Sequence, residues 1–103
     1  WGSIGEIQWV PVDRVTAKRN GFGDVTGAYV RSLYRGSSAH QAGLLPGDLV
    51  IGVNGKAVTD PDQIDRIVVD SKIGTRVKLD VLREGRKLTI DVPVVSRQQQ
   101  RIR

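Results

Sequence analysis

The stretch that decides the fold runs from residue 37 to residue 56 and reads SSAHQAGLLPGDLVIGVNGK. Its opening serines can cap one helical turn over residues 39–42, and Gly43 supplies a left-handed exit. A Pro-Gly turn follows, and the apolar run 49–53 then predicts a buried strand. Asn54-Gly55 is the strongest hairpin signal in the chain, because both residues tolerate the positive φ of a type I′ turn. The stretch predicts a helical turn, a loop, a buried strand and a hairpin in close succession.

The N-terminal third predicts two further strands. Residues 1–10 read as a glycine-containing loop that runs into a strand, which Pro11 ends. Within the polar residues 12–26 one short helix is expected before two glycines break it. Alternating side chains over residues 28–34 predict the second strand.

The C-terminal half predicts the longer helix and a closing hairpin. Asp60 can cap a helix that has Pro61 at its first position, and apolar residues then recur at helical spacing until Gly74. Residues 76–83 and 88–92 alternate around a Glu-Gly turn. The whole pattern predicts an α+β, mainly β, fold: a small, mostly antiparallel barrel or sandwich with one longer helix and one short helix.

Composition bounds the function. The chain has 103 residues, which fits one domain, and no cysteine, which excludes disulfides, thiol catalysis, zinc–thiolate sites and iron–sulfur clusters. No apolar run is long enough to span a bilayer. The single histidine, His40, could form part of a triad with Ser37 or Ser38, but a surface histidine beside a capping serine is the favoured interpretation. We expect a non-catalytic domain without metal or cofactor.

The basic excess is partly a tail. The net charge is +5, and three arginines lie in the acid-free residues 96–103, so residues 1–95 carry about +2. We expect a folded domain over residues 1–95 and a basic, flexible tail over residues 96–103. A nearly balanced domain disfavours nucleic-acid binding, which would need a basic face on the fold.

The stretch 37–56 resembles the signature of PDZ domains in HtrA-type, DegP-like serine proteases, in which Ser-Pro-Ala, Ala-Gly-Leu, Pro-Gly-Asp and Asn-Gly follow one another. Ser38 stands where proline is usual. Ser3-Ile4-Gly5 resembles the start of the carboxylate-binding loop of that family, although Ser3 replaces its aromatic residue and Glu6 an apolar one. Shorter matches lie at residues 27–30, 74–77 and 83–85, so the resemblance covers about residues 2–94.

This resemblance implies the bacterial, permuted topology, in which the binding loop and strand come first. It also implies a module that captures C-terminal or extended segments of unfolded or signal polypeptides and so regulates or feeds an attached trypsin-like serine protease in protein quality control. The partners implied are those peptide segments and the protease domain of the same parent chain, with a homo-oligomer formed through the parent. The implied location is the periplasm or cell envelope.

Physical reasoning places the binding site beside the N-terminal strand. A glycine at the start of a strand lets consecutive N–H groups converge on a carboxylate, and an unpaired strand edge can accept a peptide as an extra strand. The expected peptide-binding residues come from the loop and strand and from the facing helix: Ile4, Gly5, Glu6, Ile7, Gln8, Trp9, Ile64, Ile67, Val68 and Ser71. The apolar members of the helix set are also candidates for the core.

Two residues of the site allow two interpretations each. Glu6 is either a solvated strand residue or a carboxylate that repels a peptide carboxylate and prefers a basic neighbour, while its N–H still donates. Trp9 either packs under the sheet or flanks the groove.

Three other functions compete with peptide capture. The domain could be a structural or assembly module whose groove is filled by a neighbouring domain or by its own tail. It could belong to an intramembrane protease or a secretion component. Basic residues of the last hairpin and the tail could bind nucleic acid or an anionic membrane, although such residues usually form a solvated edge.

Overall fold

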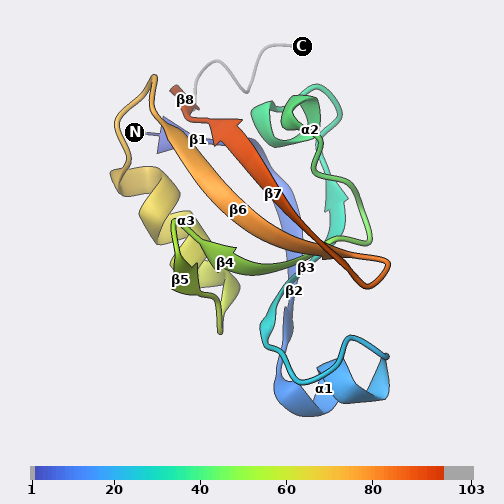
Figure 1. Ribbon diagram of the computed structural model, residues 1–103. Coiled ribbons are helices and arrows are strands. Elements are labelled where there is room, and N and C mark those ends of the chain that lie inside the picture. Colours follow the sequence, from blue (N-terminus) through green and yellow to red (C-terminus); the bar gives the residue numbers. More distant parts are fainter. Residues whose placement is uncertain (1, 97–103) are drawn as a thin grey trace.

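The computed structural model describes residues 2–96, which form two sheets and three helices (Figure 1). In the larger sheet the strand order is β2-β3-β4-β6-β7, and β5 pairs with β4 off this path; β1 and β8 form a separate two-stranded sheet. The elements are β1 Gly2–Ser3, β2 Ile7–Val12, α1 Arg14–Arg19, β3 Gly27–Leu33, α2 Ser38–Ala42, β4 Leu49–Val53, β5 Lys56–Ala57, α3 Pro61–Asp70, β6 Arg76–Arg83, β7 Arg86–Pro93 and β8 Val95–Ser96.

The predicted mainly antiparallel α+β fold is confirmed, with one correction to its shape. All the strand pairs are antiparallel, but β2 and β7 lie at opposite ends of the large sheet and do not pair, so the sheet is not a closed barrel. Two short helices, α1 and α2, accompany the longer α3; both lie in the segments expected to be helical, residues 12–26 and 39–42, although the overall fold prediction counted one short helix. The predicted boundary after residue 95 falls within β8, and the tail from residue 97 onward lies outside the described residues.

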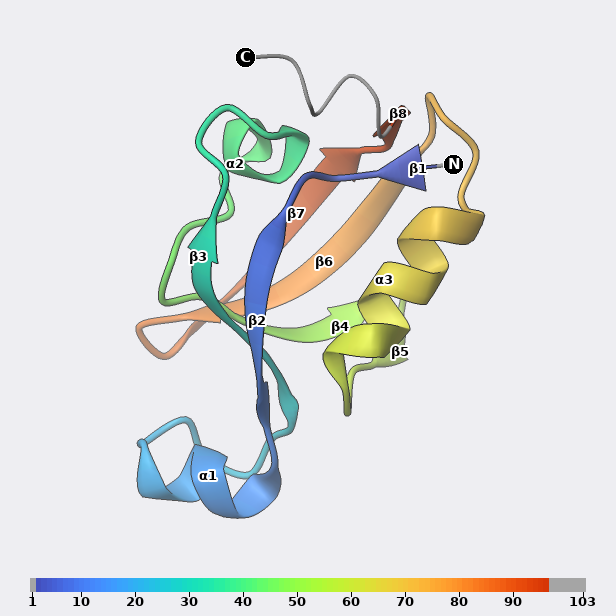
Figure 2. The ribbon, with the colours of Figure 1, turned by 180° about the vertical axis from the view of Figure 1, so that it is seen from behind.

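The core lies between the sheet and α3. Its buried side chains come from every strand of the large sheet except β2 and β5, and from α2 and α3. The connecting segments add four more: Ile4, Leu44, Val58 and Val94. Ile64 and Val68 anchor α3 to this core, with 0% and 5% of their surface exposed. Since fully burying one such side chain contributes about 1.5–3 kcal/mol, these two residues fix α3 beside β2, as Figure 2 shows.

Helix α3 starts as the sequence predicts. The Asp60 carboxylate accepts a hydrogen bond from the Asp62 amide at 2.8 Å, the Gln63 side chain accepts one from the Asp60 amide at 3.0 Å, and Pro61 takes the first helical position. The helix ends at Asp70, with Ser71 as its C-cap, rather than at Gly74. The end of α3 lies against β1, with the carbonyl oxygens of Val68 and Ser71 close to Gly2.

A buried ion pair joins the loop before β4 to the end of β6. The Asp48 carboxylate accepts hydrogen bonds from Arg83 Nε at 2.8 Å and Arg83 Nη2 at 2.7 Å, and from the Leu45 amide at 2.9 Å. Arg83 also donates to the Gly43 carbonyl at 2.7 Å, and the hydrogen bond to Asp48 raises its pKa above the ordinary value. The Pro-Gly-Asp motif of the deciding stretch is therefore tied to a hairpin some 35 residues later.

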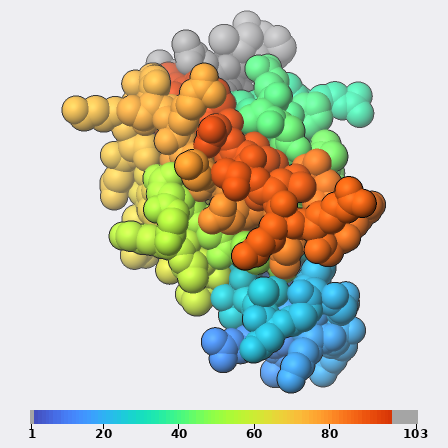
Figure 3. All heavy atoms as spheres, in the orientation of Figure 1, coloured from blue at the N-terminus to red at the C-terminus, as the bar shows by residue number. Residues whose placement is uncertain are grey.

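Helix α1 forms a lobe at one end of the molecule, which projects from the body in the space-filling view (Figure 3). Its own small core consists of Val12, Ala17 and Leu49, with partly buried side chains such as Phe22 and Tyr29 packed around them. Asp13 caps the helix by accepting a hydrogen bond from the Thr16 amide at 2.7 Å.

This cap predicts an acid-sensitive contribution to the stability of the α1 lobe. The hydrogen bonds from Thr16 lower the pKa of Asp13 below its ordinary value of 3.8. A lowered pKa in the folded state means that the stabilisation is present above the unfolded pKa and is lost as the pH falls through the folded one. Asp13→Asn keeps the cap acceptor without the charge, so its pH-dependence of unfolding is expected to be flatter in this acid range, measured by urea denaturation from pH 6 to pH 2. An identical slope in both proteins would contradict this.

No helix among residues 2–96 is long and apolar enough to cross a lipid bilayer.

Candidate functional site

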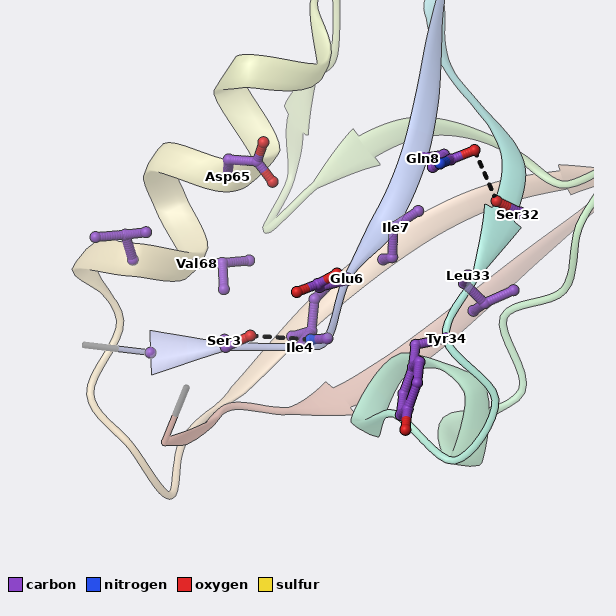
Figure 4. A pocket seen from close by; sticks show the side chains of 13 residues that line it. Ser3, Ile4, Glu6, Ile7, Gln8, Ser32, Leu33, Tyr34, Asp65 and Val68 are labelled. Carbon is purple, nitrogen blue, oxygen red and sulfur yellow. Dashed lines mark hydrogen bonds between the residues drawn. The ribbon is translucent and has the colours of Figure 1, made fainter. Parts of the chain in front are cut away.

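A pocket of about 600 Å³ lies between the start of β2, the end of β3 and one face of α3 (Figure 4). Its wall combines backbone from the β1–β2 loop with side chains of both sheet and helix. The lining residues are Gly2, Ser3, Ile4, Gly5, Glu6, Ile7, Gln8, Ser32, Leu33, Tyr34, Asp65, Val68 and Val69.

One edge of β2 is unpaired in the part of the chain that the structure describes. The strand ends the large sheet and bonds to β3 on its other side. The Tyr34 amide donates to the Glu6 carbonyl at 3.0 Å, and Ile7 lies opposite Leu33. In an antiparallel ladder bonded and non-bonded pairs alternate, so Ile7 is in a non-bonded pair and its N–H and C=O point away from β3.

The alternation of bonded and non-bonded pairs continues along β2 beyond a β-bulge. The register shifts between Gln8 and Trp9, after which Trp9 lies opposite Val30 and Pro11 opposite Ala28. Pro11 has no N–H, so its pair is also a non-bonded one, and Trp9, two residues before it, has the same orientation. Among residues 2–96, the backbone donors and acceptors of Ile7 and Trp9 therefore face the open edge without a strand partner, and Pro11 removes the next donor.

The loop before β2 is held from both sides. Gly5 adopts φ = 109°, in the left-handed region that favours glycine, and its amide donates to the Ser3 hydroxyl at 3.0 Å. The carbonyl of Ile4 accepts a hydrogen bond from the Ala39 amide of α2 at 2.9 Å. The consecutive amides expected to converge on a carboxylate are those of Ile4, Gly5 and Glu6, and the middle one, that of Gly5, is therefore already bonded within the chain.

The loop and strand residues lie largely where the sequence predicts. Ile4, Gly5, Glu6, Ile7 and Gln8 all line the pocket. The Gln8 side chain also accepts a hydrogen bond from the Ser32 hydroxyl at 3.0 Å, which ties it to β3. Trp9 is not among the residues that line the pocket, and its half-buried side chain packs against the core.

Of the peptide-binding residues predicted on and just after α3, only one lines the pocket. Val68 lines the pocket, whereas Ile64 is wholly buried in the core and Ile67 packs partly buried against it. Ser71 does not line the pocket either, and its hydroxyl donates to the Ile67 carbonyl at 2.7 Å.

Two helix residues that the sequence analysis did not name, Asp65 and Val69, also line the pocket. They flank Val68 at helical spacing, on the rim of the apolar stripe rather than on the stripe itself. The sequence does hold a signal for them. Ile64 faces the core, so residues 65, 68 and 69, which share the neighbouring face of the helix, are the ones expected to face the pocket. Ser32, Leu33 and Tyr34 were missed because their position depends on the pairing of β3 with β2.

Among the lining residues that the structure describes are two acids and no lysine or arginine. Glu6 lies on the loop side and Asp65 on the helix side, and both carboxylates are directed toward the hollow in Figure 4. The lining thus differs in sign from the chain, whose net charge is +5.

His40 and Ser37 serve the start of α2. The Ser37 hydroxyl accepts a hydrogen bond from the His40 amide at 3.2 Å and caps the helix, and His40 Nδ1 accepts one from the Gly36 amide at 3.2 Å. These bonds are those of a helix cap and a tight turn.

Comparison with known families and proteins gives one consistent result. The family model described as PDZ domain matches residues 3–94. The chain is 33% identical over 95 residues to a probable periplasmic serine endoprotease, DegP-like, of Brucella suis biovar 1, a match that covers 92% of the chain and 18% of that protein. It is 32% identical over 74 residues to the serine protease Do-like HtrA of Bacillus subtilis, covering 71% of the chain and 16% of that protein.

Solved structures agree. The HtrA-type protease AlgW, solved with a decapeptide, superposes with a TM-score of 0.76 at 26% identity, over 91% of this chain and 29% of that one. The PDZ domain of HtrA3, bound to the phage-derived ligand FGRWV, has the same fold, with a TM-score of 0.74 at 21% identity over 91% and 85% of the two chains. The chain spans less than a fifth of the length of these two curated relatives.

Proposed function

Because this chain belongs to the PDZ domain family, a class of non-catalytic modules, we propose that it binds an extended peptide segment by adding it as a strand to the open edge of β2. The observation that carries the proposal is the pocket of about 600 Å³ beside that edge, between β2 and α3. AlgW, a similar structure, was solved with a decapeptide.

The backbone of β2 supports a short ladder. Ile7 and Trp9 each offer an outward N–H and C=O, and Pro11 offers no donor. Main-chain hydrogen bonds at these two residues supply affinity, and alternate side chains of the peptide reach the pocket.

We further propose that the parent chain is an HtrA-type serine protease of the periplasm or cell envelope, and that this domain delivers segments of unfolded or signal proteins to it. The support is the similarity to serine endoproteases, some of them named as periplasmic. Peptide occupancy is then expected to change the rate at which the parent protease cleaves a reporter substrate.

Amide hydrogen exchange tests the strand addition residue by residue. On binding a decapeptide, exchange at Ile7 and Trp9 is expected to slow about tenfold or more, because their amides gain a hydrogen-bond acceptor. Gln8 and Val10 are the matched controls, because their amides already face β3. Equal slowing at all four residues, or none, would contradict strand addition.

N-methylation of the peptide gives the second readout. Methyl groups on alternate backbone amides of the peptide are expected to weaken binding about tenfold or more, and those on the intervening amides much less, because an added strand bonds through every second residue. A loss of affinity without this period of two would refute the proposed binding mode.

A further inference from the structure

We propose that two copies of this chain pair through strand β7, in an antiparallel arrangement with a two-fold axis at Thr89. The surface is the second open edge of the large sheet, at the opposite end of the strand order from β2. The inference therefore does not depend on the peptide binding proposed above. It follows from the direction of the backbone groups of β7 and from the order of charges along this strand.

The outer edge of β7 is open along most of the strand. β7 ends the large sheet, and among residues 2–96 no strand pairs with its outer side. The hydroxyl of Ser38 donates to the carbonyl of Pro93, and α2 lies beside this end of the strand in both ribbon views (Figures 1 and 2). Lys87, Thr89 and Asp91 are exposed. Within the described chain, α2 thus covers the edge at Pro93, and the edge is open from Asp91 back to the hairpin turn.

The register of the β6–β7 hairpin shows which backbone groups face this edge. The hairpin has a two-residue turn, so the pair that flanks the turn is a bonded one, and bonded and non-bonded pairs then alternate. Lys87, Thr89 and Asp91 fall in non-bonded pairs, so their N–H and C=O groups point away from β6. The carbonyl of Pro93, which comes next in this series, agrees with this direction because its donor is Ser38.

The charges along the edge are complementary to those of a second copy. Lys87 and Asp91 lie two residues before and two residues after Thr89, on the same exposed face of the strand. Antiparallel pairing centred on Thr89 places each Lys87 opposite the partner's Asp91, and the two threonines opposite each other. Opposite charges and threonine pairs are favourable neighbours across strands. Neither charged side chain has an ion-pair partner among residues 2–96.

Other antiparallel registers lose this match. Centring the pair on Lys87 or on Asp91 sets like charges opposite each other, which is unfavourable. Centring it on Leu88 or Ile90 leaves neither charge opposite the other sign. The register at Thr89 also brings all three outward-facing residues into bonded pairs and closes the assembly at two copies. A row of lysines, which is a common way to keep an edge solvated, would instead repel a second copy.

The contact is short, so we expect a weak dimer, with a Kd on the order of 100 µM. Sedimentation of the chain over a range of concentrations around this value is expected to show the monomer giving way to the dimer. Amide exchange at Thr89 is expected to slow as the concentration rises, whereas Leu88 and Ile90, whose amides already face β6, stay unchanged. A monomer throughout overturns the inference. Protection of Thr89 that is independent of concentration also overturns it, because the edge would then be covered within one chain.

Charge reversal tests the register. Lys87→Asp and Asp91→Lys each set like charges in both symmetric pairs, and each is expected to weaken the dimer about tenfold or more. An equimolar mixture of the two variants is expected to restore pairing, as is the double variant K87D/D91K, because every pair again joins opposite charges. Asp70→Lys makes the same charge change at an exposed position of α3 and is expected to leave the dimer unchanged. Equal affinity in all variants, or a loss without recovery in the mixture, overturns the inference.

Cross-linking gives a readout that does not need a long-lived dimer. The chain has no cysteine, so each substitution introduces a single thiol. The axis at Thr89 brings the Cα atoms of two Thr89→Cys copies to about 5.5 Å, which a disulfide spans, whereas two Lys87→Cys copies lie roughly 14 Å apart. In oxidised glutathione, Thr89→Cys is expected to form the disulfide dimer about tenfold faster than Lys87→Cys. A mixture of Lys87→Cys and Asp91→Cys is expected to form the mixed disulfide in preference to either symmetric one. Equal rates at residues 87 and 89 overturn the inference.

Discussion

Replacing Asp48 with alanine is expected to lower the free energy of unfolding by about 3–5 kcal/mol, because it removes one partner of a buried ion pair. The Asp48 side chain is 2% exposed and accepts three hydrogen bonds, two from Arg83 and one from the Leu45 amide. Without the carboxylate, the Leu45 amide and the partly buried guanidinium lose their acceptor. The thermal midpoint is expected to fall by roughly 15 °C or more for a domain of this size.

Arg14→Ala is the control for that substitution. Arg14 and Asp24 also form an ion pair, at 3.8 Å, but both side chains are about three-quarters exposed. Exposed pairs contribute at most about 1 kcal/mol, so chemical denaturation should place this variant close to the unmodified protein. Similar losses in the two variants would mean that burial of the Asp48 pair has no special weight.

The second large effect is expected at Gly27, the first residue of β3. A Cβ at this position would overlap the carbonyl oxygen of Val50 and lie 3.2 Å from Leu49 Cδ1. The obstacle is backbone of the neighbouring strand, which cannot rotate away, so Gly27→Ala is expected to lower the free energy of unfolding by about 3 kcal/mol. Since β3 also positions Ser32 and Leu33 in the pocket, the affinity for peptide is expected to fall with stability.

Gly23→Ala is the matched control in the same segment. Gly23 has φ = 95°, but no atom lies within 4 Å of the added Cβ, so only backbone strain opposes the change. A single left-handed residue costs about 1–2 kcal/mol. A larger loss at Gly23 than at Gly27, measured by urea denaturation, would show that conformation rather than space limits substitution here.

Local chemistry made much of the fold predictable. The start of α3 is determined by residues close together in sequence: Asp60, Pro61 and Gln63. In the same way, Asn54-Gly55 determines the position of a hairpin turn. The closure of the sheet was not predictable from such signals, because it depends on whether β2 and β7 meet. A barrel and an open sheet have the same alternation along each strand.

The residues of the candidate site were also predictable where local sequence determines them, and not where they depend on strand pairing or packing. Residues 4–8 could be named because they are consecutive and include the loop glycine, Gly5, whereas Ser32, Leu33 and Tyr34 line the pocket only through strand pairing. The apolar stripe of α3 indicated Ile64 and Ile67, but Ile64 is buried in the core and Ile67 packs partly buried against it. The pocket is lined by Asp65 and Val69, beside the stripe. The bond from Gly5 to Ser3 could not be foreseen, because a serine two residues before a glycine has several possible partners.

The pairing of β1 with β8 has a mechanical consequence. Both ends of the described chain leave the domain at one corner, joined by the pairs Gly2 with Ser96 and Ser3 with Val95. A pulling force on the two ends would load these two residue pairs first and spare the large sheet. Because Ser3 holds the Gly5 amide, the first break would also release the loop in front of the open edge, so tension on the polypeptide and the grip on a captured segment would be coupled at a single point.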